Sequence, residues 1–374
     1  MPHAWVEIDL DAIRANVVAL RKTLRRSVDF IAMVKGNAYG HGALEVARAA
    51  LEAGATHLGV AFPAEGIELR RAGIVAPILV LGSFYEDDIP EILEHGLTPC
   101  LGELAQAAAL SRAASARRVT LPVHVEVDTG MGRLGADWRH AARLIHEMSA
   151  LENLRIEGIC THFAAADESD RTYTRLQIRR FEQVSEALRE RELSIPFRHY
   201  SNSAGALHYP ESVLDAIRPG LALYGLYPNQ SGDRRVELTP ALSFRSRVVL
   251  VKRMGAGSFV SYGRSYRLPE PRYIGTISVG YADGYPRALS GRASVLIHET
   301  RYPVVGTVTM DHIMVDLGRD APPVRRGDRV TLLGREGPSA ISAEELAELA
   351  GTINYEITTR ISPRPPRVYR GRKE

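Results

Sequence analysis

The 374-residue sequence has few cysteines and no long apolar run. Two cysteines, Cys100 and Cys160, exclude a disulfide-rich scaffold and are typical of a reducing compartment. Both lie in apolar surroundings, so we expect them to be core residues. No stretch approaches the roughly 18 apolar residues of a membrane-spanning helix, and the acidic residues near the start do not fit a signal peptide. We therefore expect a cytoplasmic protein with no membrane partner.

An excess of one charge sign is also missing. The sequence has 47 Lys and Arg against 44 Asp and Glu, a net charge of +3, with basic residues scattered except in the tail "RPPRVYRGRKE". This balance predicts no nucleic-acid partner, and we interpret the tail as a solvated end. A hydrophobic content of 45% is enough for a substantial core, and the length favours two domains.

Short apolar runs alternate with helical patterns in the first two thirds of the chain. Eight runs are typical of strands: "VDFIAMV", "THLGVA", "APILVLG", "GLTPC", "VTLPVHVEV", "LRIEGICTHF", "FRHYSN" and "VLDAIRPG". Between them, apolar residues recur three and four apart, although the eighth run lacks a clear long helix before it. The pattern predicts an α/β fold with a (β/α)8 TIM-like barrel.

The pattern changes after residues 227–237. Runs such as "LSFRSRVVLVKRM", "ASVLIHE" and "DRVTLLG" are alternating or β-branched and are separated by Gly and Pro. They predict a mostly antiparallel β domain with one helix at Ser342 to Ala350. We place the boundary near Gly232, which assigns residues 1–232 to the barrel and 233–374 to the β domain.

Polar side chains follow several of the predicted barrel strands. They are Lys35 in "AMVKGNAYGHG", Asp128 in "DTGMGR", His162, the pair Asn202 and Ser203, and Arg218 in "RPG". A single strand-end lysine is usually solvated, and a single histidine is usually a hydrogen-bonded core residue. Because active sites of such barrels form at the carboxyl ends of the strands, the convergence favours a functional site.

A partly desolvated lysine has its neutral amine favoured, and a neutral amine condenses with an aldehyde. Pyridoxal 5'-phosphate is the obvious aldehyde cofactor. Its phosphate requires backbone N–H groups near the last two strands, where "SNSAG" opens a short helix and "PGLA" forms a Gly-containing turn. We expect no metal.

Several longer motifs carry a resemblance to a known family. They are "VKGNAYGHG", "DTGMGRLG", "THFAAAD", "SNSA" and "RPGLALYG" in the first domain, then "SYGRSY", "VGYADGYPR", "GTVTMDHIMVDL" and "NYEITTRI" in the second. In this order and spacing, over essentially the whole chain, the sequence resembles the alanine racemases, which are fold-type III pyridoxal-phosphate enzymes. The resemblance implies an isomerase that interconverts L-alanine and D-alanine and supplies D-alanine for cell-wall peptidoglycan.

The resemblance implies two catalytic bases. Lys35 would hold the cofactor as a Schiff base and act on one face of the α-carbon, while Tyr281 would act on the other. In this family the tyrosine reaches the neighbouring subunit, which implies a homodimer with shared active sites. Because a free tyrosine titrates at about pH 10, its phenolate needs stabilisation. The resemblance gives this role to His162, which would hydrogen-bond Tyr281 and contact Arg218.

Arg218 would face the pyridine nitrogen of the cofactor. An arginine keeps its proton, so the nitrogen would stay neutral and the ring would be a weaker electron sink. Related barrel decarboxylases have Glu-Pro-Gly where this sequence has Arg-Pro-Gly. The arginine therefore favours racemisation, for which a short-lived carbanion avoids side reactions. A barrel-closing salt bridge is the alternative role for Arg218.

The remaining site residues are carried over by position. The phosphate would be bound by Tyr39, Ser203, Gly220, Leu221 and Tyr355, with Asn202 beside them. Arg133 would contact the phenolic oxygen of the cofactor and bind the substrate carboxylate, and the backbone N–H of Met310 would also bind that carboxylate. By analogy, Tyr262, Asp167 and Tyr285 would line the entrance.

Two positions depart from the family pattern. Glu126 stands where relatives often have a carbamylated lysine that orients the arginine, so we expect Glu126 to pair with Arg133 directly or through water. Thr309 stands where several relatives have cysteine.

Alternative functions remain open. A racemase of different specificity, for serine or lysine, is the nearest alternative, and a related barrel decarboxylase is the next. A pyridoxal-phosphate carrier would use a similar lysine but would lack the β domain and the second base. A purely structural barrel would leave the clustered motifs unexplained.

Overall fold

A computed structural model describes residues 2–24, 27–228 and 235–371. The chain forms two compact units, a first composed of Ile13–Ala38 and Ala43–Thr239 and a second composed of Met1–Ala12, Tyr39–Gly42 and Pro240–Glu374. The boundary predicted near Gly232 lies outside the described residues.

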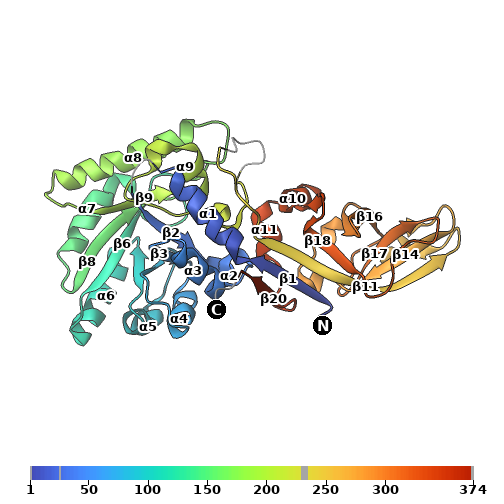
Figure 1. Ribbon diagram of the computed structural model, residues 1–374. Helices are drawn as coiled ribbons and strands as arrows, with labels where there is room; N and C mark the ends of the chain where they lie inside the picture. The colour runs from blue at the N-terminus through green and yellow to red at the C-terminus, as the bar shows by residue number, and fades with distance from the viewer. Residues whose placement is uncertain (1, 25–26, 229–234, 372–374) are drawn as a thin grey trace. The chain divides into compact units, whose positions relative to one another are not determined.

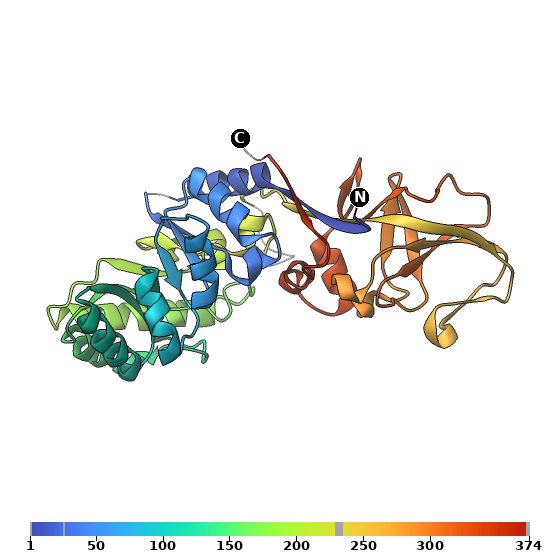
Figure 2. The same ribbon diagram turned by 90° about the horizontal axis from the view of Figure 1, so that it is seen from below.

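The first unit is a parallel β-barrel surrounded by helices (Figures 1 and 2). Its eight strands are β2 (Asp29–Met33), β3 (His57–Val60), β4 (Ile78–Val80), β5 (Thr98–Leu101), β6 (Leu121–Asp128), β8 (Leu154–Cys160), β9 (Phe197–Ser201) and β10 (Ala216–Ile217). Pairing of β5 with β6 closes the barrel, and the short β7 (Ala136–Asp137) adds to β6. All eight predicted strands are present, and the predicted barrel is confirmed.

The barrel helices follow the expected order. They are α3 (Ala43–Glu52), α4 (Pro63–Arg71), α5 (Ile89–Glu94), α6 (Leu104–Arg117), α7 (Trp138–Ser149), α8 (Thr172–Arg189) and α9 (Ser203–His208), with α1 (Leu10–Lys22) preceding them. In α7, Ala141, Ile145 and Met148 recur at three- and four-residue intervals and are buried, so this face packs inward. The helix before the eighth strand is short, as its sequence predicted.

The second unit is a mostly antiparallel β structure, as predicted. Its strands are β11 (Leu242–Met254), β12 (Phe259–Val260), β13 (Tyr266–Arg267), β14 (Arg272–Ile277), β15 (Ser294–Ile297), β16 (Thr300–Val305), β17 (Ile313–Gly318), β18 (Arg329–Glu336) and β19 (Ser339–Ile341). The long β11, yellow in Figure 2, pairs with both β14 and β18. These pairings close a ring that runs β11–β14–β17–β16–β15–β18.

The two ends of the chain join this second sheet. Strand β1 (Ala4–Asp9) pairs antiparallel with β11, and β20 (Arg367–Arg370) pairs parallel with β1 (Figure 1). The sequence assigns residues 1–12 to the barrel and interprets the tail as a solvated end; the tail is indeed exposed or half-exposed, but its last described residues form a strand, which was not predicted. Both strands are short, and their partners are distant in sequence, so local patterns carry no signal of the pairing.

The predicted helix near Ser342 is confirmed. Ser342 caps α10 (Ala343–Ala350) by accepting a hydrogen bond from the N–H of Glu345, and Gly351 ends it in the left-handed conformation. A second helix, α11 (Asn354–Thr359), was not predicted, because six residues are too few to establish a helical period.

Arg367 explains why the basic tail is ordered. Its guanidinium donates to the carbonyl oxygens of Gly40 at 3.1 Å, Ile361 at 2.7 Å and Pro365 at 2.9 Å.

We predict that Arg367→Ala lowers the midpoint of thermal unfolding by on the order of 5 °C, because several carbonyls lose a charged donor. The control is Arg370→Ala, which removes one exposed ion pair with Glu7 and should change little. Equal shifts in the two variants, measured by calorimetry, would contradict this role of Arg367.

Candidate active site

Lys35 lies two residues after the end of β2 and begins a left-handed turn. Gly36, Asn37 and Ala38 have φ values of 61°, 51° and 53°. Each left-handed residue with a side chain costs roughly 1–2 kcal/mol, so the turn needs support from outside. Glu65 supplies part of it, because its Oε1 accepts the N–H of Gly36 at 2.7 Å. The strained turn fixes the backbone from which the Lys35 side chain extends.

The environment of Lys35 favours its neutral amine. Burial lowers the pKa of Lys35, and the positive charges of Arg133 and Arg218 lower this pKa further. The carboxylates of Glu65 and Glu126 act in the opposite direction but do not cancel these effects. The lysine predicted as a nucleophilic amine therefore lies among groups that make it one.

Arg218 is a buried cation held by uncharged acceptors. Its side chain is 4% exposed. Nη1 donates to Nδ1 and to the carbonyl oxygen of His199, both at 2.6 Å, and Nη2 donates to the carbonyl oxygen of Thr161 at 2.7 Å. No carboxylate among the described residues forms an ion pair with Arg218. Arg218 thus keeps its positive charge at the site without an ion-pair partner, which suits an anionic ligand.

Two buried histidines extend the hydrogen-bond chain behind Arg218. His199 Nε2 lies 2.7 Å from His124 Nδ1. Because Arg218 can only donate, His199 accepts at Nδ1 and carries its proton on Nε2, which makes His124 Nδ1 an acceptor. Burial lowers the pKa of His124 to about 3 and that of His199 well below its usual range, so both are neutral. Neither residue was predicted from the sequence, because a histidine inside a strand resembles any core residue.

His162 also lies beside Arg218. Its Nδ1 is 3.5 Å from Arg218 Nη2, which confirms the predicted contact between the two side chains. Burial, together with the charges of Arg218 and Arg133, lowers the pKa of His162 to about 3. The ring is therefore neutral and, with Nδ1 facing a donor, carries its proton on Nε2.

Backbone N–H groups gather after β9 and β10, where the phosphate site was predicted. Asn202 caps α9, and Ser203 Oγ accepts the N–H of Gly220 at 3.0 Å, which joins the two loops. Within the described part of the chain, the N–H groups of Ser203, Ala204 and Leu221 have no hydrogen-bond partner. Three unpaired donors at two short helical starts form a cradle for an anion.

Arg133 and Glu126 belong to the same end of the barrel. Arg133 is exposed on the loop after β6. Asp128 stabilises this loop by accepting hydrogen bonds from the N–H groups of Gly130 and Gly132. Burial raises the pKa of Glu126, while Arg218 and Arg133 counteract this rise. No hydrogen bond or ion pair joins Glu126 to Arg133 in the described ranges, so the direct form of the predicted pairing is not found.

The other predicted site residues lie in the second unit. Tyr281 is exposed by 43% and Met310 by 53%. The rings of Tyr39 and Tyr355 lie with centroids 6.2 Å apart. Burial raises the pKa of Tyr39 to about 12, so its phenol remains a hydrogen-bond donor.

The entrance residues fall into two groups. Tyr262 is exposed by 75%, and Asp167 is exposed as well. Tyr285 is buried, so the expectation that it lines an open entrance is wrong for this chain. Tyr285 belongs to the same turn as Tyr281, since its N–H donates to the carbonyl of Gly280, yet its side chain is only 1% exposed.

The barrel groups fit pyridoxal phosphate. Lys35 offers an amine to an aldehyde, and the unpaired N–H groups of Ser203, Ala204 and Leu221 offer donors to a phosphate. The hydrogen bonds of Arg218 to described residues all use Nη1 and Nη2, so its Nε–H is available to a ring nitrogen. The residues present could therefore hold this cofactor.

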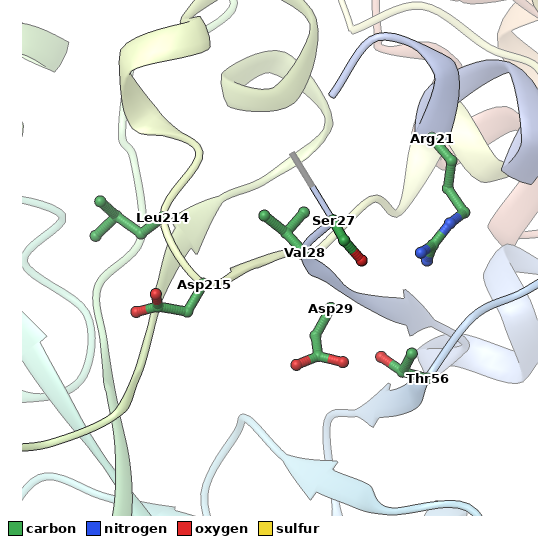
Figure 3. Close-up of a pocket in the computed structure, with 7 residues that line it drawn as sticks. All are labelled: Arg21, Ser27, Val28, Asp29, Thr56, Leu214 and Asp215. Atoms are coloured by element: carbon green, nitrogen blue, oxygen red, sulfur yellow. The ribbon is translucent and has the colours of Figure 1, made fainter. Parts of the chain in front are cut away.

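A separate cavity of about 210 Å³ lies at the opposite end of the barrel (Figure 3). It is lined by Arg21, Ser27, Val28, Asp29, Thr56, Leu214 and Asp215. Asp29 begins β2 and Asp215 precedes β10, so these are the amino ends of the strands. Residues at this end of a barrel usually contribute to stability rather than to catalysis. Asp215, moreover, already forms an ion pair with Arg198 at 2.9 Å. We therefore assign the functional site to the Lys35 end.

The lowered pKa of Lys35 predicts its reactivity in the cofactor-free protein. A lower pKa keeps the amine neutral at lower pH, so labelling by acetic anhydride should rise at lower pH than for Nα-acetyl-lysine, whose side chain titrates near pH 10.4. Competitive labelling followed by peptide mass spectrometry measures both midpoints. A midpoint for Lys35 at or above that of the free amino acid would contradict the environment described for it.

Comparison with known proteins identifies the family of this chain. The sequence profile "Alanine racemase, N-terminal domain" matches residues 8–228, and "Alanine racemase, C-terminal domain" matches residues 241–369. The alanine racemase of Symbiobacterium thermophilum is 48% identical over 373 residues, covering 99% of this chain and 98% of that protein.

Solved structures extend this likeness to the fold. The alanine racemase of Clostridium difficile 630 superposes with a TM-score of 0.95 at 36% identity, covering 99% of this chain and 96% of that one. A histidine racemase from Leuconostoc mesenteroides superposes with a TM-score of 0.91 at 31% identity, covering 99% and 98%. With both domain profiles matched in order along nearly its full length, this chain belongs to the alanine racemase family.

Proposed function

We propose that this protein interconverts L-alanine and D-alanine with pyridoxal 5'-phosphate as cofactor, by a two-base mechanism. The observation that carries the proposal is the amine of Lys35, whose pKa is lowered by burial, by Arg133 and by the charge of the buried Arg218. D-alanine made in the cytoplasm would serve the synthesis of cell-wall peptidoglycan.

The cofactor, when bound, supplies an aldehyde for the amino group of the substrate and an electron sink for its α-carbon. Lys35 would hold the cofactor through its amine, and as a neutral amine it would accept or return a proton on one face of the α-carbon. The same lowered pKa supports both roles, because each requires the neutral amine.

Tyr281 serves the opposite face. Racemisation requires that the proton return from the side opposite to its removal, so a second acid–base group must face Lys35 across the substrate. His162 supports this role, because it is neutral and carries its proton on Nε2, which can donate to the phenolate of Tyr281. Its Nδ1 stays in contact with Arg218, which polarises the ring further.

Two groups would bind the substrate carboxylate. Arg133 offers an exposed guanidinium at the barrel end, and Met310 offers its backbone N–H in the second unit. Fixing the carboxylate at two points would orient the α-hydrogen toward one base at a time. The anion cradle and Tyr39, with its protonated phenol, would bind the cofactor phosphate together with Gly220 and Tyr355.

Arg218 distinguishes racemisation from decarboxylation. Its Nε–H can donate a hydrogen bond to the ring nitrogen. Because an arginine does not give up its proton, and because its positive charge disfavours a second cation beside it, the nitrogen would stay unprotonated. A barrel decarboxylase would have a glutamate here, whereas Arg218 contacts neutral acceptors and forms no ion pair with a carboxylate among the described residues.

A homodimer with shared sites is part of the proposal. Each unit exposes large apolar side chains that a second copy could cover. On the barrel, Phe62, Tyr85, Leu104 and Leu134 each follow the carboxyl end of a strand; on the second unit, the exposed residues include Phe259, Tyr262, Tyr281 and Met310. A head-to-tail pair would bring Tyr281 of one copy to the barrel of the other.

A racemase for another amino acid is the second candidate. The histidine racemase of Leuconostoc mesenteroides shares the fold at 31% identity, so the architecture by itself is compatible with a larger side chain. Alanine is favoured here by the identities of 48% and 42% to alanine racemases over nearly the full chain.

The test is incubation of the purified protein with pyridoxal phosphate and L-alanine in deuterated water. Loss of the α-proton is followed by NMR, and D-alanine by chiral chromatography. We expect both to appear, and both to be lost in Lys35→Ala, because this amine would hold the cofactor as well as serve one face of the α-carbon. L-serine, L-lysine and L-histidine provide the specificity comparison.

Two outcomes would contradict the proposal. Exchange of the α-proton without any D-alanine would mean that only one face is served and that Tyr281 is not a base. Faster racemisation of another amino acid than of alanine would favour the second candidate.

A further inference from the structure

Three segments of the second unit meet around Tyr281. They are the Tyr281–Asp283 turn (η5), the loop of residues 309–312, and residues 360–364 after α11. The N–H of Tyr281 donates to the carbonyl of Thr309 at 3.0 Å, and the N–H of Ala282 donates to the carbonyl of Met310 at 3.1 Å. A Cβ atom added at Gly280 would lie 2.2 Å from the oxygen of Met310, so the turn and the loop are in close contact.

Arg364 joins the same segments through charge. Its Nε lies 3.2 Å from Asp283 Oδ1, and its Nη1 lies 2.7 Å from Asp311 Oδ1. The other oxygen of Asp283 accepts the N–H of Gly280 at 2.9 Å. One guanidinium therefore bridges a carboxylate in the Tyr281 turn and a carboxylate next to Met310.

Ser362 strengthens the connection from the same stretch of chain. Its N–H donates to the carbonyl of Asp283 at 3.1 Å, and its hydroxyl donates to the carbonyl of Ala282 at 2.7 Å. Residues 362 and 364 thus hold the turn by its backbone and by its one buried carboxylate.

We propose that Arg364 is a positioning residue that holds Tyr281 and Met310 in a fixed relation, so that the base and the carboxylate-binding N–H act on the same substrate molecule. This inference rests on the proposed function, which makes Tyr281 a base and Met310 a ligand of the carboxylate. Arg364 itself touches neither substrate nor cofactor in this account.

The bridge differs from an ordinary surface ion pair. Exposed pairs contribute little to stability, and Arg364 is itself 53% exposed on its side chain. Asp283, however, is only 5% exposed, so loss of its partner leaves a carboxylate in a poorly solvated place inside the turn. The fork of an arginine can reach two carboxylates at once, which the single ammonium of a lysine cannot do with the same geometry.

The experiment compares Arg364→Gln with Arg360→Gln. Arg360 lies in the same segment and pairs with Glu356 at 3.2 Å on an exposed helix face, so its loss removes an ion pair that holds no other segment. The first measurement is hydrogen–deuterium exchange of backbone amides in the cofactor-free proteins. We expect the amides of Tyr281 and Ala282 to exchange on the order of tenfold faster in Arg364→Gln and at the wild-type rate in Arg360→Gln.

The second measurement is the ratio of α-hydrogen exchange to inversion, started from each enantiomer of alanine in deuterated water. For the enantiomer whose α-hydrogen Lys35 removes, exchange needs only Lys35, whereas inversion also needs a proton from Tyr281. Misplacement of Tyr281 in Arg364→Gln should therefore slow inversion more than exchange, and the ratio of exchange to inversion should rise on the order of tenfold. For the other enantiomer, both rates should fall together. A purely structural defect would reduce the amount of active protein and leave both ratios unchanged.

The outcomes distinguish a failure of the positioning role of Arg364 from a failure of the proposed function. Unchanged ratios and unchanged amide exchange in Arg364→Gln, with normal racemisation by the wild-type protein, would overturn the positioning role alone. A wild-type protein that does not racemise alanine would overturn the proposed function, and the positioning role with it. If Arg364→Gln does not fold, Asp311→Asn replaces it, because this variant keeps the pair with buried Asp283 and loses only the connection to the Met310 loop.

Discussion

The buried charge of Arg218 is the constraint on which the rest of the site depends. The guanidinium is stabilised by neutral acceptors, chiefly the carbonyls of Thr161 and His199 and the imidazole of His199. Because no described carboxylate forms an ion pair with it, its positive charge affects the pKa values of the titratable side chains around it. Burial is the main cause of the lowered pKa values of Lys35 and His162, and the charge of Arg218 lowers both further; at Glu126 it opposes the rise in pKa that burial causes.

Backbone geometry supplies the other half of the site. A left-handed turn after β2 fixes the origin of the Lys35 side chain, and two short helical starts after β9 and β10 leave N–H groups unpaired. Neither feature is favourable in an isolated chain, since one is strained and the other leaves donors unsatisfied. Both become useful where an anionic ligand with an aldehyde can bind, which is why we connect them with the proposed cofactor.

Much of the fold could be predicted from the sequence, because the eight barrel strands are local apolar runs bounded by turns. The pairing of β1 and β20 could not, because it joins residues at opposite ends of the chain. The positions of Lys35 and Arg218 at the carboxyl ends of barrel strands were predictable from the sequence, and their roles remain those proposed from the family motifs. His124 and His199 were not, because their role depends on side-chain geometry inside the barrel. The prediction for Tyr285 failed for a related reason, since its exposure depends on the direction of one turn.

The most direct test of the account is subunit complementation between Lys35→Ala and Tyr281→Ala. Each variant alone should be inactive. If one copy supplies the lysine and a second copy the tyrosine, an equimolar mixture allowed to exchange subunits forms hybrid dimers with one intact site. Random pairing then predicts about one quarter of the wild-type rate of alanine racemisation. A mixture that exchanges subunits, verified by mass spectrometry of the intact dimers, and yet stays inactive would contradict a shared two-base site.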